Sequence, residues 1–463
     1  MTYATTNPYT NETLATFPAI GDEELERALA TAQSTFEEWR TKSFDQRKQV
    51  VKRAAEILRE RADDFARLPT LEMGKLYGES KDEVELAASI LDYYADNAEE
   101  FLAPERVDTE SPDAGEAVVV SDPIGILFGV QPWNFPYYQL ARIAGPNLMA
   151  GNVVMVKHAE IVPQSAAAFE RLFHEAGAPE GAYTNVYASK EQVARAIKDP
   201  RVKGVALTGS EGAGASVASN AGEELKKSTL ELGGSDALIV LADADLDMTV
   251  ERALWGRLNN AGQSCVASKR IIVVDDVADE FLRRFHDGVA QLKAGDPFDP
   301  ETTLPPLSSQ GAADNLDALV DEAVENGASV ATPGDPVPED GAFVQPRILT
   351  EVTKDNPVHD KEFFGPVALF FRARDEEEAV RIANDSSFGL GGSVFTEDTD
   401  HGMDVARRID TGMVFVNHPT WTRPDLPFGG TKRSGYGHEL SAAGIQEFVN
   451  KKLIKVMPKQ SSA

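Results

Sequence analysis

Between residues 125 and 241, short apolar runs alternate with segments of helical periodicity, and this alternation most limits the possible folds. It predicts strands at Gly125–Val130, Asn152–Lys157, Thr184–Tyr187, Lys203–Thr208, Thr229–Leu232 and Asp236–Leu241. Helices are predicted between them, near residues 137–150, 164–176, 190–198 and 212–221. Strands that alternate with helices of about ten to fifteen residues are typical of parallel βαβ units. The pattern therefore predicts an α/β fold with open, parallel-rich sheets.

A second alternation from about residue 245 to residue 417 predicts another α/β domain. Its strands are expected near residues 270–274, 343–349, 366–373, 391–395 and 412–417. The N-terminal part is rich in helical periodicity, with helices expected from Asp22 to about Arg40, at Gln46–Leu68 and at Lys81–Leu102, separated by Pro69 and Gly78. A polar segment before the β-like run Ala117–Val120 predicts a protruding hairpin.

The charge balance excludes one class of partner. The 463 residues include 75 acidic and 45 basic side chains, a net charge of −30, whereas nucleic-acid binding needs a basic surface. The acids are spread along the chain, which predicts an acidic folded surface and suggests a halophilic source.

Other features of composition bear on the compartment. The N-terminus has no basic region followed by an apolar run, and no window holds eighteen apolar residues, so we expect no signal peptide and no membrane span. One cysteine excludes an internal disulfide and suggests a reducing, cytoplasmic compartment. The seven histidines show no ligand spacing, and no metal site is expected.

Cys265, the only cysteine, follows a helix predicted at Asp245–Leu258 and precedes a strand predicted at Lys269–Val274. Gly262 is expected to break the helix and to leave the thiol on a short loop at the edge of a sheet. A lone cysteine is more often a small buried apolar residue than a nucleophile. The polar neighbours Gln263 and Ser264 favour chemistry over burial, but they leave both readings open.

Polar or glycine-rich loops follow several predicted strands, where open parallel sheets bind their ligands. Asn134 precedes Pro136, a residue suited to a helix start, and serves there either as an oxyanion donor or as an ordinary cap. The loop Thr208–Gly214 opens a helix and can cradle phosphate. It lacks the Gly-x-Gly-x-x-Gly fingerprint, so by itself it reads as a glycine-rich turn.

Two acids complete the set of candidates. Glu231 lies between two leucines at a strand end, where alternation turns it to solvent or keeps it for proton transfer. Glu362 lies in the loop Lys361–Pro366 and has the same ambiguity between a surface acid and a functional one.

Taken together, these loops and Cys265 resemble the aldehyde dehydrogenase superfamily from Pro132 to about Phe448. The motifs are Pro-Trp-Asn-Phe-Pro (132–136), Val-Lys-His-Ala-Glu (156–160), Thr-Gly-Ser (208–210), Leu-Glu-Leu-Gly-Gly (230–234), Gly-Gln-Ser-Cys (262–265), Glu-Phe-Phe-Gly-Pro (362–366) and Pro-Phe-Gly-Gly-x-Lys-x-Ser-Gly (427–435). The segments at residues 157–159, 233–236 and 417–421 resemble those of the branch of this superfamily that contains succinate-semialdehyde dehydrogenases.

The resemblance implies an NAD(P)-dependent oxidation of an aldehyde through a thiohemiacetal and a thioester on Cys265. Asn134 would hold the oxyanion, Glu231 would activate water, and Arg142 would bind the carboxylate of succinate semialdehyde. The positions that match cofactor-binding residues are Trp133, Lys157, Glu160, Gly209, Ser210, Gly214, Leu232, Glu362 and Phe364. NAD is expected over NADP, because Glu160 would face a 2′-phosphate, although Lys157 permits some use of NADP.

The same resemblance implies a division of the chain. It gives a cofactor-binding domain at residues 1–106 and 122–231, a catalytic domain at 232–427, and an oligomerisation hairpin and C-terminal arm at 107–121 and 428–463. A homodimer or homotetramer is expected, with a strand near residues 445–457 seeking a partner chain. The alternatives are a dehydrogenase of another small aliphatic aldehyde, a coenzyme-A-acylating relative, which Glu231 argues against, and a non-catalytic member of the fold.

Overall fold

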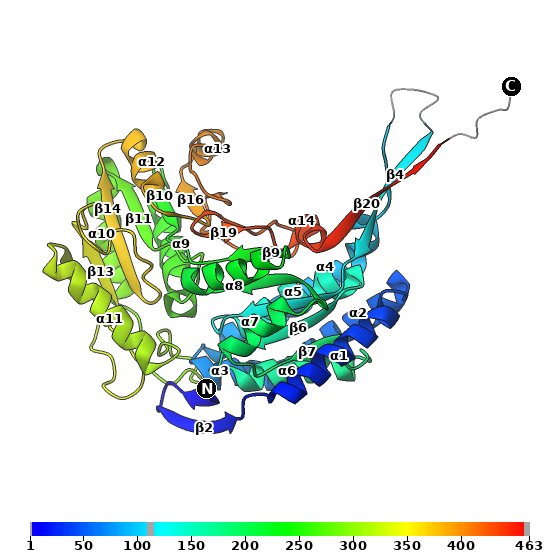
Figure 1. Cartoon of the computed structure of the whole chain (residues 1–463). Coiled ribbons are helices and arrows are strands. Elements are labelled where there is room, and N and C mark those ends of the chain that lie inside the picture. The colour runs from blue at the N-terminus through cyan, green and yellow to red at the C-terminus, as the bar shows by residue number, and fades with distance from the viewer. Residues whose placement is uncertain (1, 109–114, 458–463) are drawn as a thin grey trace.

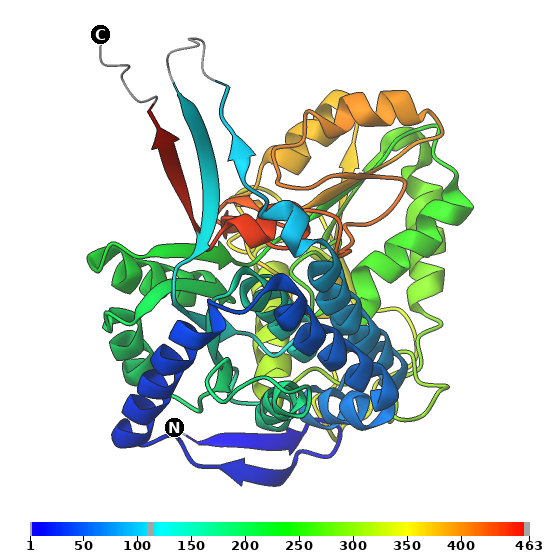
Figure 2. The ribbon, with the colours of Figure 1, turned by 90° about the vertical axis from the view of Figure 1, so that its right-hand side faces the viewer.

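The computed structural model describes residues 2–108 and 115–457. Two bodies, each built around a sheet with helices, lie side by side, and a β-arm projects away from them (Figures 1 and 2). The prediction of an α/β fold with parallel-rich open sheets is confirmed. Among the described residues, no helix is long and apolar enough to cross a membrane.

The first sheet has six strands. In spatial order they are β19 (Gly435–Tyr436), β9 (Lys227–Glu231), β8 (Val202–Thr208), β5 (Ile126–Gln131), β6 (Val153–His158) and β7 (Tyr183–Asn185). All neighbours are parallel except β19, which runs antiparallel to β9. The carboxyl ends of β5, β8 and β9 meet at one edge, because Val130 pairs with Leu207 and Thr208 pairs with Glu231.

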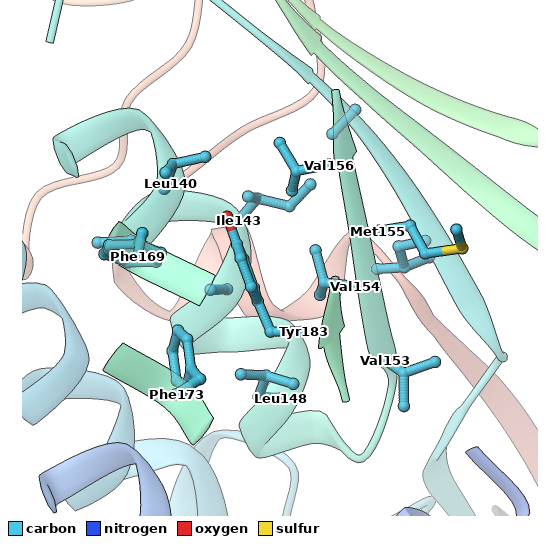
Figure 3. Close-up of a cluster of buried hydrophobic side chains, with 14 of the residues drawn as sticks. Leu140, Ile143, Leu148, Val153, Val154, Met155, Val156, Phe169, Phe173 and Tyr183 are labelled. Carbon is cyan, nitrogen blue, oxygen red and sulfur yellow. The ribbon is translucent and has the colours of Figure 1, made fainter. Parts of the chain in front are cut away.

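The helices that follow these strands are α5 (Pro136–Ala150), α6 (Pro163–Glu175), α7 (Lys190–Lys198) and α8 (Glu211–Glu223). Figure 3 shows Val154 and Val156 of β6 turned toward Leu140 and Ile143 of α5, whereas Met155 points to the other side of the strand. This alternation buries both faces of β6 in one large core. The sheet is therefore covered on both sides, as its unbroken apolar strands require.

Four helices and a hairpin surround this sheet. They are α1 (Asp22–Trp39), α2 (Phe44–Glu60), α3 (Ala62–Met73) and α4 (Tyr77–Phe101), with the hairpin β1 (Tyr3–Asn7) and β2 (Glu12–Phe17). The prediction of one helix at Gln46–Leu68 was wrong, because the chain breaks at Arg61 and starts a new helix. Pro69 lies inside α3, which ends instead at Met73 and is capped by Gly74, where a φ of 75° suits glycine.

The second sheet has seven strands. In spatial order they are β12 (Ser329–Ala331), β13 (Arg347–Thr350), β14 (Val367–Ala373), β11 (Arg270–Val274), β10 (Ala237–Val240), β16 (Gly392–Phe395) and β17 (Phe415–Val416). Only β12 is antiparallel to its neighbour. Its helices are α9 (Leu246–Leu258), α10 (Asp275–Val289), α11 (Gln310–Glu325), α12 (Glu376–Asn384) and α13 (Thr399–Ala406). A two-stranded sheet of β15 (Phe388–Gly389) and β18 (Thr431–Lys432) and the helix α14 (Ser441–Gln446) complete the bodies.

The β-arm consists of β3 (Glu105–Arg106), β4 (Glu116–Pro123) and β20 (Val449–Val456). β20 pairs antiparallel with β4 along their whole lengths, so the chain itself covers one edge of β20. The other edge has no partner strand among the described residues. Residues 109–114 of the predicted hairpin at 107–121, and residues 458–463 of the predicted C-terminal arm, lie outside the described residues.

A buried ion pair links the helical layer to the start of α5. Lys75 and Glu83 pair with fully buried side chains. The other oxygen of Glu83 accepts hydrogen bonds from the backbone N–H groups of Tyr137, at 2.7 Å, and Tyr138, at 3.2 Å. A carboxylate at a helix N-terminus is favoured by the helix dipole, so Glu83 fixes where α5 begins.

Removal of Lys75 tests this link. The substitution Lys75→Met leaves the buried Glu83 carboxylate without its cation, which we expect to destabilise the fold by about 3–5 kcal/mol. The matched control is Lys52→Met, because Lys52 pairs with Asp96 at the surface, where one ion pair contributes only about 0–1 kcal/mol. Thermal unfolding should show a much larger fall in Tm for Lys75→Met, and equal falls would contradict this account.

Candidate active site

Cys265 follows an unusual reversal of the chain. α9 ends at Leu258, and Asn260, Ala261 and Gly262 then have φ angles of 55°, 53° and 74°. The break therefore begins before Gly262, the residue predicted to cause it. Left-handed backbone is uncommon for alanine and signals strain that the surroundings must hold in place.

Side-chain amides hold this reversal. Asn260 Nδ2 donates to the carbonyl oxygens of Asn134, at 2.9 Å, and Gln263, at 3.1 Å. Asn134 Nδ2 also donates to the Gln263 carbonyl, at 3.1 Å. Asn134 stands one residue before the N-cap of α5, so the loop with the thiol is bonded to the start of that helix. Asn260 was not predicted, and only the run of polar residues before Cys265 hinted at it.

A buried lysine supports the loop from the other side. Lys269 Nζ donates to the carbonyl oxygens of Ser264, at 2.6 Å, and Cys265, at 2.9 Å, and lies 3.1 Å from Glu362 Oε1. The same Glu362 oxygen accepts from the Gly234 N–H at 3.1 Å. Sequence reasoning missed Lys269, although a charged residue at the start of the fully buried strand β11 was a usable signal.

Two cavities meet at the thiol. The first, of about 190 Å³, has a wall rich in aromatic side chains and is called the aromatic pocket here. Its rings come from Phe135, Tyr138, Trp255, Trp421 and Phe428. The second, of about 210 Å³, lies at the carboxyl ends of β5, β8 and β9 and is called the strand-end cleft.

Within the described part of the chain, Cys265 and Gln139 are the only residues that line both cavities. Gln139 lies on α5 and is fully buried, and its Oε1 has no hydrogen-bond partner among the described residues. It was not predicted, because nothing in the sequence separates it from a core residue of α5. The sulfur is thus placed where molecules in two separate cavities can both reach it.

Burial sets the protonation states at this junction. It raises the pKa of the Cys265 thiol to about 12, and the positive charges of Lys269 and Arg142 oppose that rise. The resting thiol is therefore neutral near pH 7 and needs a base to react. Burial, reinforced by the negative charge of Glu439, also raises the pKa of Glu231 well above its ordinary value.

Glu231 ends β9 in the wall of the strand-end cleft. Both of its carboxyl oxygens are buried and lack hydrogen-bond partners within the described residues. Of the two open readings, the solvent-facing acid is wrong because the Glu231 side chain is buried, and the acid kept for proton transfer stays a prediction. A carboxyl group with a raised pKa and free oxygens is suited to accept a proton near neutral pH.

Most of the predicted cofactor-binding residues line the strand-end cleft. They are Trp133, Gly209, Ser210, Leu232, Glu362 and Phe364. Gly214 lies below the cleft, where a Cβ atom would stand 2.6 Å from the Leu232 side chain. Lys157 and Glu160 lie outside this wall, at and just beyond the end of β6, where Lys157 Nζ and Glu160 Oε1 are 2.7 Å apart.

The cleft, together with the neighbouring Lys157–Glu160 pair, has side chains suited to a dinucleotide. The N-terminus of α8, capped by Ser210, presents free N–H groups to a phosphate. The carboxylates of Glu160 and Glu362 are suited to ribose hydroxyls, and the rings of Trp133 and Phe364 meet edge to face with centroids 5.7 Å apart. Gly233 leaves room for the Glu362 side chain in the cleft, since a Cβ atom at this position would lie 2.5 Å from Glu362 Oε2.

Arg257, another residue that was not predicted to shape this cleft, holds the loop that carries Glu362. Its guanidinium is buried and donates to the carbonyl oxygens of Val367, at 2.8 Å, and Phe363, at 3.0 Å.

The structure does not bring Arg142 to the wall of the aromatic pocket. Its guanidinium is fully buried behind Tyr138 and Phe428, stacks over both rings at 4.8 and 4.4 Å, and pairs with Glu439. Its Nη1 donates to the Tyr138 hydroxyl at 3.1 Å. The charge acts on the site from behind its wall, and substrate binding by Arg142 stays a prediction.

Comparison with known proteins identifies the relatives of this chain. The succinate-semialdehyde dehydrogenase [NADP(+)] of Deinococcus radiodurans is 51% identical over 456 residues, which cover 98% of this chain and 95% of the relative. The probable succinate-semialdehyde dehydrogenase [NADP(+)] of Synechocystis is 44% identical over 98% of this chain and 99% of its own. The crystal structure of succinic semialdehyde dehydrogenase from Streptococcus pyogenes with NADP+ superposes with a TM-score of 0.96, at 45% identity, over 98% of this chain and all of that one.

The sequence pattern of the family described as aldehyde dehydrogenase matches residues 1–454, nearly the whole chain. It covers both sheets, the two cavities and the residues around Cys265. The resemblance stated from the sequence is confirmed, and the chain belongs to the aldehyde dehydrogenase family, an NAD(P)-dependent group of enzymes that oxidise aldehydes.

Proposed function

We propose that the chain oxidises succinate semialdehyde to succinate, with Cys265 as the nucleophile and NAD(P) as the oxidant. The observation that carries the proposal is the position of the thiol at the junction of the aromatic pocket and the strand-end cleft. An aldehyde in the first cavity and a dinucleotide in the second would meet at this sulfur. The choice of substrate is supported by relatives that are named succinate-semialdehyde dehydrogenase and that align with this chain over nearly their full lengths.

The residues divide the chemistry between them. The Cys265 thiol gives its proton to water, and the sulfur bonds to the aldehyde carbon to give a thiohemiacetal. The amide of Asn134 and the backbone N–H of Cys265 hold the oxyanion. NAD(P) held in the strand-end cleft would supply the hydride acceptor, and loss of the hydride would leave the acyl group on the Cys265 sulfur as a thioester. Glu231 then takes a proton from water, the water oxygen displaces the sulfur, and the acid leaves.

The cofactor would be held by the residues of the strand-end cleft and by the Lys157–Glu160 pair. From the resemblance, Lys157 and Glu160 would meet the adenosine ribose and Glu362 the nicotinamide ribose. Lys269 supports this arrangement, because it fixes both Glu362 and the carbonyl oxygen of Cys265.

The chain as a whole would follow the family plan. The proposed units are a cofactor-binding domain at 1–106 and 122–231, a catalytic domain at 232–427, and an oligomerisation part at 107–121 and 428–463. The exposed apolar side chains of Leu453, Ile454 and Val456 on the arm support a homodimer or homotetramer. The lone cysteine supports a cytoplasmic location for the protein, and the net charge of −30 supports a halophilic source.

Substitution of the proposed base tests the two-step mechanism. In Glu231→Gln the amide cannot take a proton from water, so release of the acid should slow more than its formation on the sulfur. Mass spectrometry after mixing with aldehyde and NAD(P) should find an acyl adduct on Cys265. The variant Cys265→Ser should show neither the adduct nor a burst of NAD(P)H. A slow acylation step without an adduct in Glu231→Gln would show that another group is the base.

The substrate assignment is tested with Arg142. We expect wild type to prefer succinate semialdehyde over butanal in kcat/KM, and Arg142→Leu to lose about 2–4 kcal/mol of that preference, the range for loss of a buried charge contact. The Arg142→Leu substitution is made together with Glu439→Gln, because the buried Glu439 carboxylate would otherwise lose its partner. The control is Arg423→Leu, which removes an exposed cation next to Thr422 of the aromatic pocket. An unchanged preference in the Arg142 variant would remove Arg142 from substrate binding.

For the cofactor we propose a preference for NAD, although the relatives cited above are named for NADP+. The Glu160 carboxylate already neutralises Lys157, the cation that would pair with a 2′-phosphate, and it would repel that phosphate. Two like charges about 4 Å apart repel by roughly 1 kcal/mol in water. Glu160→Gln should therefore raise the NADP to NAD ratio of kcat/KM about fivefold or more. The surface control Glu175→Gln should leave the ratio alone, and no change in Glu160→Gln would contradict the proposal.

A further inference from the structure

The charged side chains in the wall of the aromatic pocket are all acidic. They are Glu79, Asp82 and Glu83, and among the residues that the structure describes no lysine, arginine or histidine lines the cavity. Arg142, the cation behind the wall, is paired with Glu439. An aldehyde that carries a carboxylate would therefore enter a pocket whose own charges oppose it. Neutralisation of one of these acids would remove part of that opposition.

The three acids are not equivalent. Glu83 is neutralised by Lys75 and also accepts two backbone hydrogen bonds. Asp82 is exposed, so water screens its charge. Glu79 is partly buried, and its Oε1 accepts from the backbone N–H of Asn260, at 3.0 Å, and from Asn259 Nδ2, at 3.2 Å.

The second oxygen of Glu79 sets this residue apart. Oε2 is buried and has no hydrogen-bond partner among the described residues. A buried carboxylate oxygen without a donor is costly to keep charged, whereas a neutral carboxyl group can carry its proton there. Glu79 is thus the acid of this wall whose charge is least supported by its neighbours.

We propose that Glu79 is a specificity-determining residue that couples binding of an anionic aldehyde to uptake of one proton. With Glu79 neutral, the pocket accepts the substrate carboxylate; with Glu79 ionised, it repels that carboxylate and still accepts an uncharged aldehyde. The inference rests on the proposed function for the identity of the anionic substrate, succinate semialdehyde. No bond to carbon is made or broken in this step, and the proton comes from solvent.

The electrostatic surroundings of Glu79 agree with this role. Burial raises its pKa, and the negative charges of Asp82 and Glu83, on the same helix α4, raise it further. The Asn260 N–H and the Lys75 ammonium act in the opposite direction. A bound substrate carboxylate would add another negative charge and stabilise the neutral form. Since the neutral form dominates below the pKa, anionic substrates are favoured at low pH and lose that advantage as pH rises.

The test is the pH dependence of a ratio. The quantity is kcat/KM for succinate semialdehyde divided by kcat/KM for butanal, from pH 6 to pH 9, with saturating NAD. Titration of Cys265 and Glu231 affects both substrates, so the ratio cancels it. In wild type the ratio should fall with pH, by up to about tenfold per unit, the slope for one proton.

Two isosteric variants make the test specific. Glu79→Gln keeps an oxygen for Asn260 and Asn259 but cannot ionise, so its ratio should be flat and should exceed the wild-type ratio at pH 9. Asp82→Asn removes an exposed acid from the same wall and should keep the wild-type decline. Turnover of butanal by Glu79→Gln reports that the loop before Cys265 is intact.

A wild-type ratio that does not change with pH, or an equal decline in Glu79→Gln, would overturn the proposal. If succinate semialdehyde is not oxidised at all, the proposed function fails separately. In that case the inhibition constant of succinate semialdehyde against butanal oxidation is measured in place of the ratio. A rise of that constant with pH in wild type and not in Glu79→Gln would still support the role of Glu79, and a constant independent of pH would refute it.

Discussion

The arrangement around the thiol depends on one buried ammonium group, that of Lys269. A buried charge has to be paired and hydrogen-bonded, and this one is satisfied by two backbone carbonyls of the Cys265 loop and by Glu362. Those partners belong to two segments, the Cys265 loop and the loop that carries Glu362, and both segments contribute to the lining of the strand-end cleft. The same cation therefore ties the Cys265 loop to the loop that carries Glu362, and it also opposes the rise in the thiol pKa that burial causes.

The sequence was most informative where secondary structure is buried on both faces. The unbroken apolar runs of β5, β6 and β11 predicted their strands to within about two residues, because only a covered parallel sheet tolerates such runs. It failed where local signals compete. Pro69 suggested a break, but α3 continues through it to Met73, and β17 is shorter than its apolar run because tertiary pairing limits it to two residues.

For the site, residues with a chemical signature were predictable and residues that support them were not. Cys265, Glu231 and Asn134 stand in recognisable motifs, and the structure places all three in the wall of the strand-end cleft. Asn260 and Lys269 act through hydrogen bonds to backbone atoms, which leave no spacing pattern in a sequence. The partner of Arg142 is Glu439, 297 positions away along the chain, a contact that no local pattern reveals.

The position of the lone cysteine also decides how the protein can be handled chemically. Because Cys265 is the only thiol in 463 residues and lies between two cavities, a maleimide or iodoacetamide reagent has a single destination. The mass gained by the intact protein then counts directly how many molecules have an accessible Cys265 thiol. The same fact means that a fluorophore attached through the native cysteine would occupy the space between the two cavities, so a surface label needs an introduced thiol and a protected Cys265.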